Sequence, residues 1–377
     1  MTHVVTNAVS ISLFLARSFL RAFFLFSYTH NSSFSLELLM SSPQLLYSPV
    51  SISTKLKPWD MRKVFFEKVQ QKGGFTCHHA HFDKAYLISC ENLLLSQRDM
   101  QEKWRLYRDL KKSYTFEDLY IRIARGVERM IEQGVTHCRS FIDADALVGL
   151  LPLKVALAVR EEYKHLIHLE FAVQPLEGVL EPKAQKAFVK ACELADIIGG
   201  LPSRDRPNPR AHLDFIMELA TDLGKPIDVH IDQENQPGEH ETEMLALATI
   251  DHGLEGRVRG VHAISLAAQE LSEQKRVCEL VKEAGVGIII CPSAALSMKP
   301  REGLAPIHNS IAPLRPLLEA GVDLALGVDN IADLFMPMVD GDLWFESRLL
   351  MEATRCYDLD LISDIVTARW GFCNQEK

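Results

Sequence analysis

Phe75-Thr-Cys-His-His-Ala-His-Phe82 is the stretch at which the regular pattern of the chain begins, and it contains the motif His79-x-His81. Its apolar and β-branched residues predict a buried strand. Because alternate residues of a strand point to the same face, His79 and His81 are expected to share one wall of a cavity, whereas His78 faces away and is expected to be structural. Two imidazoles so placed can bind one metal ion. An H-x-H motif alone is a weak signal, because paired histidines on strands more often serve packing or surface roles.

Seven similar segments follow, so eight strands are expected in all. They cover residues 75–82, 137–143, 168–174, 197–201, 226–231, 259–264, 286–291 and 323–328. Helices are expected between them, for example over residues 115–133, 209–223 and 267–284, each followed by a glycine suited to a left-handed helix cap. Strands that alternate with helices predict a parallel sheet. This regularity, in a chain without a G-x-G-x-x-G or Walker-type loop, favours a TIM-type (β/α)8 barrel over an open doubly wound sheet.

The size of the chain fits one catalytic domain. With 377 residues and 47% hydrophobic content, it can bury one large core. We assign residues 59–377 to the barrel, either bare or truncated at its C-terminus, with little or no accessory β-sandwich. Residues 1–58 are expected to be an N-terminal extension that is disordered, serves as a targeting peptide, or results from a misassigned start, with Met40 or Met61 as the true first residue.

Charge and cysteine usage exclude several functional classes. The formal net charge is −9 and no run of Lys and Arg exceeds two residues, so neither a nucleic acid polymer nor an anionic membrane is an expected partner. The apolar stretch from Ala8 to Tyr28 contains Arg17 and Arg21, which disfavours a membrane-spanning helix. The eight cysteines form no C-x-x-C pair, as expected for buried thiols of a cytoplasmic protein. A small-molecule substrate is therefore expected, and a homo-oligomer remains possible.

Three further strand ends carry residues suited to metal-assisted hydrolysis. His230 closes the fifth expected strand and supplies a third imidazole. His262, on the next strand, can either bind the metal or hydrogen-bond the attacking water. Asp329 follows the last strand, where its carboxylate can bind the metal and accept a proton from that water. A bound divalent metal would lower the pKa of the water toward neutrality.

At this point the ordered motifs resemble the amidohydrolase superfamily, and most closely its cytosine deaminase branch. The motifs are His79-Ala-His81-Phe-Asp-Lys, Gln174-Pro-Leu-Glu-Gly, Gly199-Gly-Leu-Pro, Ile227-Asp-Val-His230, Val261-His262 and Gly327-Val-Asp329. The resemblance implies that His79, His81, His230 and Asp329 bind one zinc or iron ion, and that His262 and Asp329 handle the water and its protons. The fourth expected strand has no lysine that could be carboxylated, so a mononuclear site is expected.

Departures from the branch bear on the proton chemistry and the substrate. The branch places a glutamate three residues after the fifth-strand histidine, whereas this chain has Gln233 there and Glu234 next to it. Since an amide does not titrate, either Glu234 reaches the site through a local backbone shift, or Asp329 and His262 do the proton work. Leu176 stands where the branch has a substrate-binding glutamine, and Gln174 is displaced to the strand end.

The expected substrate-binding residues are Gln233, Gln174 and, because it ends the second expected strand, Asp143. Asn330 replaces a second acidic residue of the branch, so cytosine itself is not the expected substrate. The leading interpretation is a deaminase of a small heterocycle. The alternatives are an imidazolonepropionase-like hydrolase that opens a cyclic amide, which Gln233 favours, and a non-catalytic or incomplete metal-binding barrel.

Overall fold

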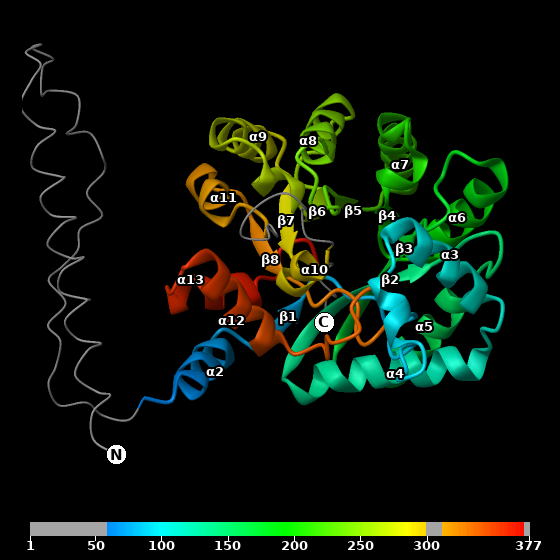
Figure 1. The fold of residues 1–377 in the computed structure, drawn as a ribbon, viewed down its shortest axis with the longest axis horizontal. Helices are drawn as coiled ribbons and strands as arrows, with labels where there is room; N and C mark the ends of the chain where they lie inside the picture. Colours follow the sequence, from blue (N-terminus) through cyan, green and yellow to red (C-terminus); the bar gives the residue numbers. More distant parts are fainter. Residues whose placement is uncertain (1–58, 299–310, 373–377) are drawn as a thin grey trace, which may run out of the picture. The chain divides into compact units, whose positions relative to one another are not determined.

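Eight parallel strands form the centre of the molecule in a computed structural model, which describes residues 59–298 and 311–372 (Figure 1). They are β1 (Phe75–Cys77), β2 (Val135–Asp143), β3 (His168–Gln174), β4 (Ile198–Gly200), β5 (Ile227–Ile231), β6 (Val258–His262), β7 (Gly287–Ile290) and β8 (Leu324–Leu326). Every expected strand is present at the expected place, which confirms the α/β barrel class. The expectations for residues 1–58 lie outside the described residues.

The strands are hydrogen-bonded in chain order, in one sheet of three strands (β1-β2-β3) and one of five (β4 to β8). A single parallel bridge, Ala172 to Ile197, links the two sheets on one side, and another, Ala80 to Asp329, links them on the other. Residues 59–298 and 311–372 contain no strand beyond these eight. The second bridge involves Asp329 itself and lies beside His79 and His81, so the seam between the first and last strands coincides with the expected site.

Helices surround the strands and follow them in alternation (Figure 1). They are α2 (Met61–Gln71), α3 (Met100–Lys111), α4 (Phe116–Glu132), α5 (Leu151–Tyr163), α6 (Pro182–Leu194), α7 (Pro209–Leu223), α8 (Glu241–Asp251), α9 (Leu271–Glu283), α10 (Pro292–Ser297), α11 (Leu314–Ala320), α12 (Leu343–Thr354) and α13 (Leu359–Thr367), with short 3-10 turns η1 (Leu93–Gln97), η2 (Pro202–Asp205) and η3 (Ser265–Ala268).

The helices expected over 115–133 and 209–223 are confirmed as α4 and α7. The helix expected over 267–284 is divided into η3 and α9, because Gln269 and Glu270 adopt extended backbone conformations between them. Gly134, Gly224 and Gly285 take φ angles of 78°, 66° and 59°, the left-handed conformation expected after each helix.

A buried layer of charge fills the N-terminal end of the barrel interior. Arg139 on β2 pairs in register with Glu170 on β3, and Asp228 on β5 pairs in register with Arg259 on β6. Arg139 Nη2 lies 2.8 Å from Glu170 Oε2, Arg139 Nη1 lies 3.2 Å from Asp228 Oδ2, and Arg259 Nε donates to Asp228 Oδ1. Since alternate residues share a face, the interior position that follows Asp228 is His230. The strand pattern that places this charge therefore also directs the imidazole of His230 into the barrel.

We expect the substitution Asp228→Asn to lower the free energy of unfolding by about 3–5 kcal/mol, because it leaves two buried guanidinium groups without the carboxylate between them. Urea denaturation followed by circular dichroism measures this loss. Asp360→Asn is the control, since Asp360 is an exposed partner of Lys68 and its loss should change stability little. Equal stability of the Asp228 variant and the wild type would contradict the importance of the buried layer.

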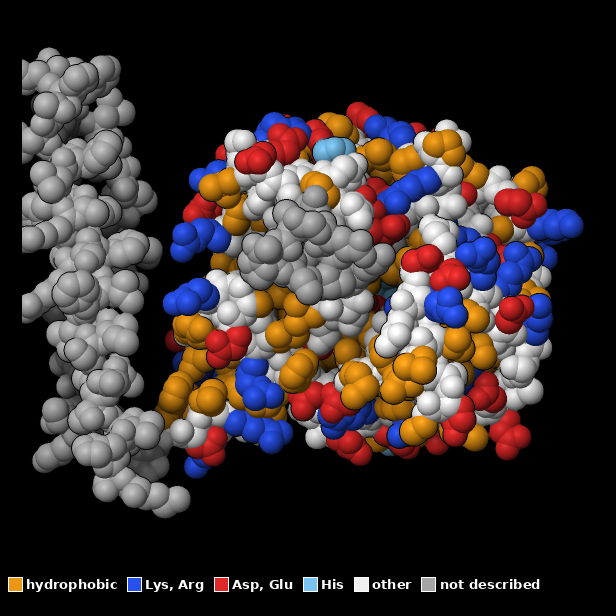
Figure 2. Space-filling model, viewed as in Figure 1, with side chains coloured by type: hydrophobic (Ala, Val, Ile, Leu, Met, Phe, Trp, Pro, Cys, Tyr) orange, Lys and Arg blue, Asp and Glu red, His pale blue; other side chains and the backbone are white. Residues whose placement is uncertain are grey.

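Positive and negative side chains are mixed on the visible face of the molecule, where Lys and Arg are interspersed with Asp and Glu (Figure 2). In the part of the chain that the structure describes, no helix has both the length and the apolar character needed to cross a bilayer.

Candidate active site

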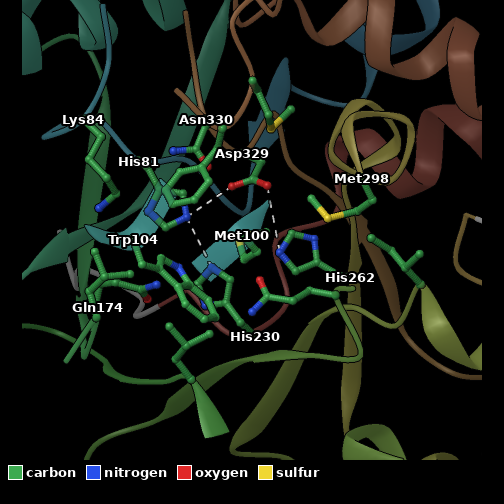
Figure 3. A pocket seen from close by; sticks show the side chains of 16 residues that line it. His81, Lys84, Met100, Trp104, Gln174, His230, His262, Met298, Asp329 and Asn330 are labelled. Atoms are coloured by element: carbon green, nitrogen blue, oxygen red, sulfur yellow. Dashed lines mark hydrogen bonds and ion pairs between the residues drawn. The ribbon is translucent and has the colours of Figure 1, made fainter. Parts of the chain in front are cut away.

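Three histidines and one aspartate from distant parts of the chain converge inside the barrel. One ligand atom from each of His79, His230, His262 and Asp329 lies within 4.8 Å of the other three, and all four residues are buried. His81 adjoins this group, with its Nε2 atom 3.2 Å from His230 Nε2 and 3.2 Å from Asp329 Oδ1. Figure 3 shows the labelled imidazoles turned toward the Asp329 carboxylate. The candidate residues that the sequence placed at strand ends are thus brought together.

The backbone at the seam of the barrel positions Asp329 against His79. The backbone amides of Val328 and Asp329 donate to His79 O over 3.0 and 3.1 Å. A Cβ atom at Gly327 would lie 2.6 Å from His79 Cβ, so the close approach of the two segments requires glycine. This contact gives the Gly327-Val-Asp329 motif a structural reason.

Two of the converging residues have strained backbones. Asp329 and His262 have φ angles of 61° and 85°, in a region that side-chain-bearing residues rarely adopt. Such conformations cost about 1–3 kcal/mol each and cluster at functional sites. The strain supports the view that these two side chains are held in place for function.

The donor set fits a divalent metal ion. His79 Nε2 lies 3.2 Å from Asp329 Oδ1, yet neither atom has a partner with hydrogen-bond geometry among the described residues. Buried polar atoms without partners are rare, since each costs about 1–3 kcal/mol. Nitrogen and oxygen ligands that point toward a common centre are what zinc and iron sites use. The donors of His79, His81, His230 and Asp329 therefore fit one such ion, and His262 lies beside them.

Burial sets the protonation states that metal binding needs. Removal from water lowers the pKa of His81 to about 3 and that of His262 to about 4, and it lowers the pKa of His230 well below its usual value. Burial by itself would raise the pKa of Asp329, but the neighbouring imidazoles of His79 and His81 hold that pKa well below its ordinary value. At neutral pH the imidazoles of His81, His230 and His262 are therefore neutral and the carboxylate of Asp329 is charged, as ligands must be.

A cavity opens onto this group from the C-terminal ends of the strands. Its free volume is about 40 Å³, space for little more than one water molecule. Gln174, Gln233, Asn330 and Lys84 supply polar groups to its wall. The apolar part of the wall is formed by Met100, Trp104, Leu176, Leu201, Ile264, Met298, Phe335 and Met336. Gln174 Oε1 is buried without a hydrogen-bond partner in the described chain, whereas Gln233 Nε2 donates to Ser203 Oγ over 3.2 Å.

Comparison with known proteins assigns the family. The family model described as "Amidohydrolase family" matches residues 73–364, which is most of the chain. The chain belongs to the amidohydrolase family. The resemblance inferred from the ordered motifs is thereby confirmed, and the site lies within the matched residues.

Several individual proteins are similar to this amidohydrolase. An uncharacterized protein of Haemophilus influenzae is 38% identical over 66% of this chain and 91% of its own length. N-isopropylammelide isopropyl amidohydrolase of Pseudomonas sp. is 27% identical over 78% of this chain and 72% of its own. Pterin deaminase of Rhizobium rhizogenes is 26% identical, and the matched region spans 76% of this chain and 65% of that protein.

Among solved structures, 5-methylcytosine deaminase from Klebsiella pneumoniae in complex with 5-fluorocytosine superimposes with a TM-score of 0.72. It is 24% identical, and the match covers 78% of this chain and 72% of that one. At this identity the likeness establishes a shared fold.

The structure does not bring Glu234 into the cavity of this amidohydrolase. Glu234 Oε1 lies 3.0 Å from Arg206 Nη1, and the cavity wall contains Gln233 instead. Asp232 and Asn235, with φ angles of 49° and 55°, turn the backbone on either side of this pair. The local shift that would carry Glu234 inward is therefore absent from the structure, and the expected position of Glu234 in the cavity is corrected.

Asp143 also has a different environment from the one expected. Its carboxylate is fully buried between two lysines, with Oδ1 2.6 Å from Lys84 Nζ and Oδ2 2.5 Å from Lys111 Nζ. It does not line the cavity, whereas Lys84 does. Asp143 thus holds a lysine that faces the site, and the expectation of direct substrate contact is corrected accordingly.

The cover of the cavity was not foreseen from the sequence. Helix α3, inserted after β1, contributes Met100 and Trp104 to the wall, and Phe335 and Met336 come from the loop after β8. Asp333 organises this loop: Oδ2 accepts from Tyr107 Oη and Asn330 Nδ2, both over 2.5 Å, and Oδ1 accepts from the amides of Phe335 and Met336. One buried carboxylate thereby connects α3 to three residues of the cavity wall.

We expect Tyr107→Phe to raise KM more than it lowers kcat, because the variant loses the hydrogen bond that ties α3 to Asp333 but keeps the ring that stacks on Phe335. One lost hydrogen bond to a charged group corresponds to about a tenfold effect. Steady-state kinetics with the best substrate found give the two parameters. The control is Tyr357→Phe, whose exposed hydroxyl bonds Glu352 away from the cavity. An unchanged KM, or a fall in kcat alone, would oppose this positioning role.

Proposed function

We propose that this amidohydrolase uses one divalent metal ion to deaminate a small nitrogen heterocycle. The observation that carries the proposal is the buried convergence of His79, His230, His262 and Asp329, of which the last three line a cavity. Family membership supports hydrolysis of a carbon–nitrogen bond that is not a peptide bond. The names of two relatives, which refer to N-isopropylammelide and pterin, support a heterocyclic substrate.

The roles of the site residues follow from their positions. A divalent ion held by His79, His81, His230 and Asp329 would supply hydroxide at neutral pH by lowering the pKa of a water. His262, whose Nε2 lies 3.9 Å from Asp329 Oδ2, is placed to hydrogen-bond that water and the substrate. Asp329 accepts one proton of the water and passes it to the amino nitrogen of the substrate, which leaves as ammonia. The oxygen that stays on the ring carbon gives its remaining proton to the adjacent ring nitrogen and becomes a carbonyl oxygen.

Polar groups of the wall would orient the ring. Gln174 offers a buried amide whose Oε1 has no protein partner in the described chain, and Gln233 and Asn330 add two more amides. Leu176 lines the same wall, and its apolar side chain offers no hydrogen bond to the edge of a cytosine ring. Because the free volume is about 40 Å³, a ring enters only if side chains such as Met100, Met298 or Trp104 adopt other rotamers.

Ring opening of a cyclic amide is the second candidate function. It is favoured by Gln233, which lines the wall where the deaminase branch has a titratable glutamate. The same hydroxide would attack a ring carbonyl, and the proton from Asp329 would go to a ring nitrogen that stays attached to the product. No ammonia is released in that reaction, which gives a clear distinction.

Ammonia release over a panel of aminopyrimidines, aminotriazines, pterins and imidazolones tests the proposal with the full chain after incubation with zinc or iron. We expect ammonia in a one-to-one ratio with the hydroxylated ring product. Parallel assays of Asp329→Asn, purified in the same way, correct for contaminating deaminases. A ring-opened product without ammonia would establish the second candidate instead.

The third possibility is a barrel without catalytic activity, and metal analysis distinguishes it from the proposed enzyme. Less than about one-tenth equivalent of zinc, iron or manganese after reconstitution, together with unchanged thermal stability, would favour that class, because an ion that binds the native state stabilises it. The proposed enzyme would work in the cytoplasm, where the free cysteines of the described chain stay reduced. A homo-oligomer is proposed as its assembly state.

A further inference from the structure

A second cavity adjoins the catalytic one on the other side of Trp104 and Leu176, which line both. Its free volume is about 310 Å³, much larger than that of the catalytic cavity. One face of helix α3 forms one wall, and the loops after β2, β3 and β4 form the rest. Both cavities lie at the C-terminal ends of the strands, the side on which barrel enzymes bind their ligands.

The second cavity has an excess of positive charge. Its wall contains three arginines, Arg105, Arg108 and Arg204. It also contains two carboxylates: that of Asp145, which pairs with Lys111, and that of Glu177. Arg108 Nε lies 3.5 Å from Glu177 Oε1, so one cation and one anion offset each other. The guanidinium groups of Arg105 and Arg204 have no carboxylate within ion-pair distance in the described chain.

The other charged groups of this wall are neutralised by a buried chain of ion pairs. Lys111 Nζ lies 2.5 Å from Asp143 Oδ2 and 2.7 Å from Asp145 Oδ2. Asp143 in turn pairs with Lys84 over 2.6 Å. Lys111 and Asp145 face the second cavity and Lys84 faces the catalytic one, so the chain joins the two walls. Asp83 Oδ1 also lies 3.2 Å from Lys84 Nζ, so the two lysines meet three carboxylates and add no surplus positive charge. The surplus therefore belongs to the two arginines.

Arg204 is held in a fixed position for ligand binding. Its Nε atom donates to Leu176 O over 2.7 Å, and its guanidinium carbon lies 4.3 Å from the centre of the Trp104 ring. The two terminal nitrogens donate to no described residue, which leaves a planar pair of donors suited to a carboxylate or phosphate. Burial also lowers the pKa of Arg204, so an anion beside it would offset the cost of removing this cation from water.

We propose that the second cavity binds an anionic group, a carboxylate or a phosphate, through Arg204 and Arg105. Because Trp104 and Leu176 line both cavities, we favour a substituent of the heterocyclic substrate as the source of this anion. The ring would lie in the catalytic cavity and its anionic substituent in the second one. That assignment to the substrate rests on the proposed function. Binding of the anion itself does not, because it involves none of the residues that carry the hydrolysis.

Calorimetric titration of the full chain with pterin, pterin-6-carboxylate and inorganic phosphate tests this proposal without relying on turnover. Two charged hydrogen bonds should make the carboxylate bind about tenfold more tightly than pterin. Arg204→Met and Arg105→Met should each remove most of this advantage and leave the affinity for pterin unchanged. Lys112→Met is the matched control, because it removes one exposed positive charge from the end of the same helix but does not line the cavity.

Phosphate distinguishes the two sources of the anion. If phosphate weakens binding of pterin-6-carboxylate but not of pterin, the cavity holds an arm of the substrate. If phosphate binds in an Arg204-dependent manner and the carboxylate gives no advantage, the anion is a separate ligand. Affinities that do not respond to either arginine substitution, in variants with wild-type circular dichroism, would overturn the site. Failure of the proposed function appears separately, as absence of ammonia from any substrate.

Discussion

Replacing His79 or His230 with alanine is expected to abolish metal retention, from close to one equivalent in the wild type to less than about one-tenth. Each substitution removes one imidazole from a donor set that is brought together from three distant segments of the chain. The carboxylate and imidazoles that remain no longer surround an ion, and hydrolysis should disappear with it. Metal content after dialysis, measured by inductively coupled plasma mass spectrometry, gives the direct readout.

Thermal stability provides a second readout for the same variants. Zinc should raise the melting temperature of the wild type and leave that of His79→Ala and His230→Ala unchanged, because only a native-state ligand stabilises the fold. His78→Asn is the matched control: His78 adjoins His79 in the chain, but its Nε2 bonds Ala368 O and its ring packs against Trp370. Full metal retention by either alanine variant would remove the metal centre from this part of the barrel.

The sequence was sufficient to predict the barrel and the converging residues, for a physical reason. A parallel barrel places the C-terminal ends of all its strands at one rim, so a histidine or aspartate that ends a strand is brought to that rim whatever its distance along the chain. His230 and Asp329 lie 99 positions apart in the sequence and within one 4.8 Å cluster in space. The period of two also predicted that His78 would face away from the site.

Residues outside the strands could not be placed in the same way. Glu234 and Gln233 are neighbours, and the side to which each side chain points depends on backbone turns at Asp232 and Asn235. No local sequence pattern predicts these turns. Asp143 ends its strand as expected, but its role depends on Lys111, which lies on the inserted helix α3. Trp104 belongs to the same helix, whose amphipathic pattern indicates a buried face without showing that this face covers the site.

Buried charges on both sides of the site are arranged in ion pairs. Charges that face the barrel interior are paired at its N-terminal end, around Asp228, and again between Lys84 and Asp143 at the rim. Between these layers, burial lowers the pKa of His230 and of His262, and the neighbouring imidazoles lower the pKa of Asp329, so its carboxylate is charged at neutral pH. A single carboxylate in such surroundings is well placed to move a proton, and this leads to the second large effect.

Asp329→Asn is expected to lower kcat by about 10²–10⁴-fold, the usual contribution of one positioned acid–base group. The amide keeps the shape and one oxygen of the carboxylate but does not accept the proton of the attacking water. Because His79, His81 and His230 remain, most of the metal should be retained, which separates this variant from the alanine variants above. Single-turnover kinetics on metal-matched samples measure the chemical step directly.

The comparison variant for Asp329→Asn is Asp360→Asn, which makes the same chemical change at an exposed carboxylate that pairs with Lys68. It should retain bound metal and measurable turnover, whereas Asp329→Asn should retain metal and lose turnover. A normal rate in Asp329→Asn would refute its proton role and leave His262 as the remaining candidate for that step. Loss of both the bound metal and the activity would instead show that the carboxylate acts mainly as a metal ligand. Proton transfer requires the basicity of this group, whereas metal binding requires its negative charge.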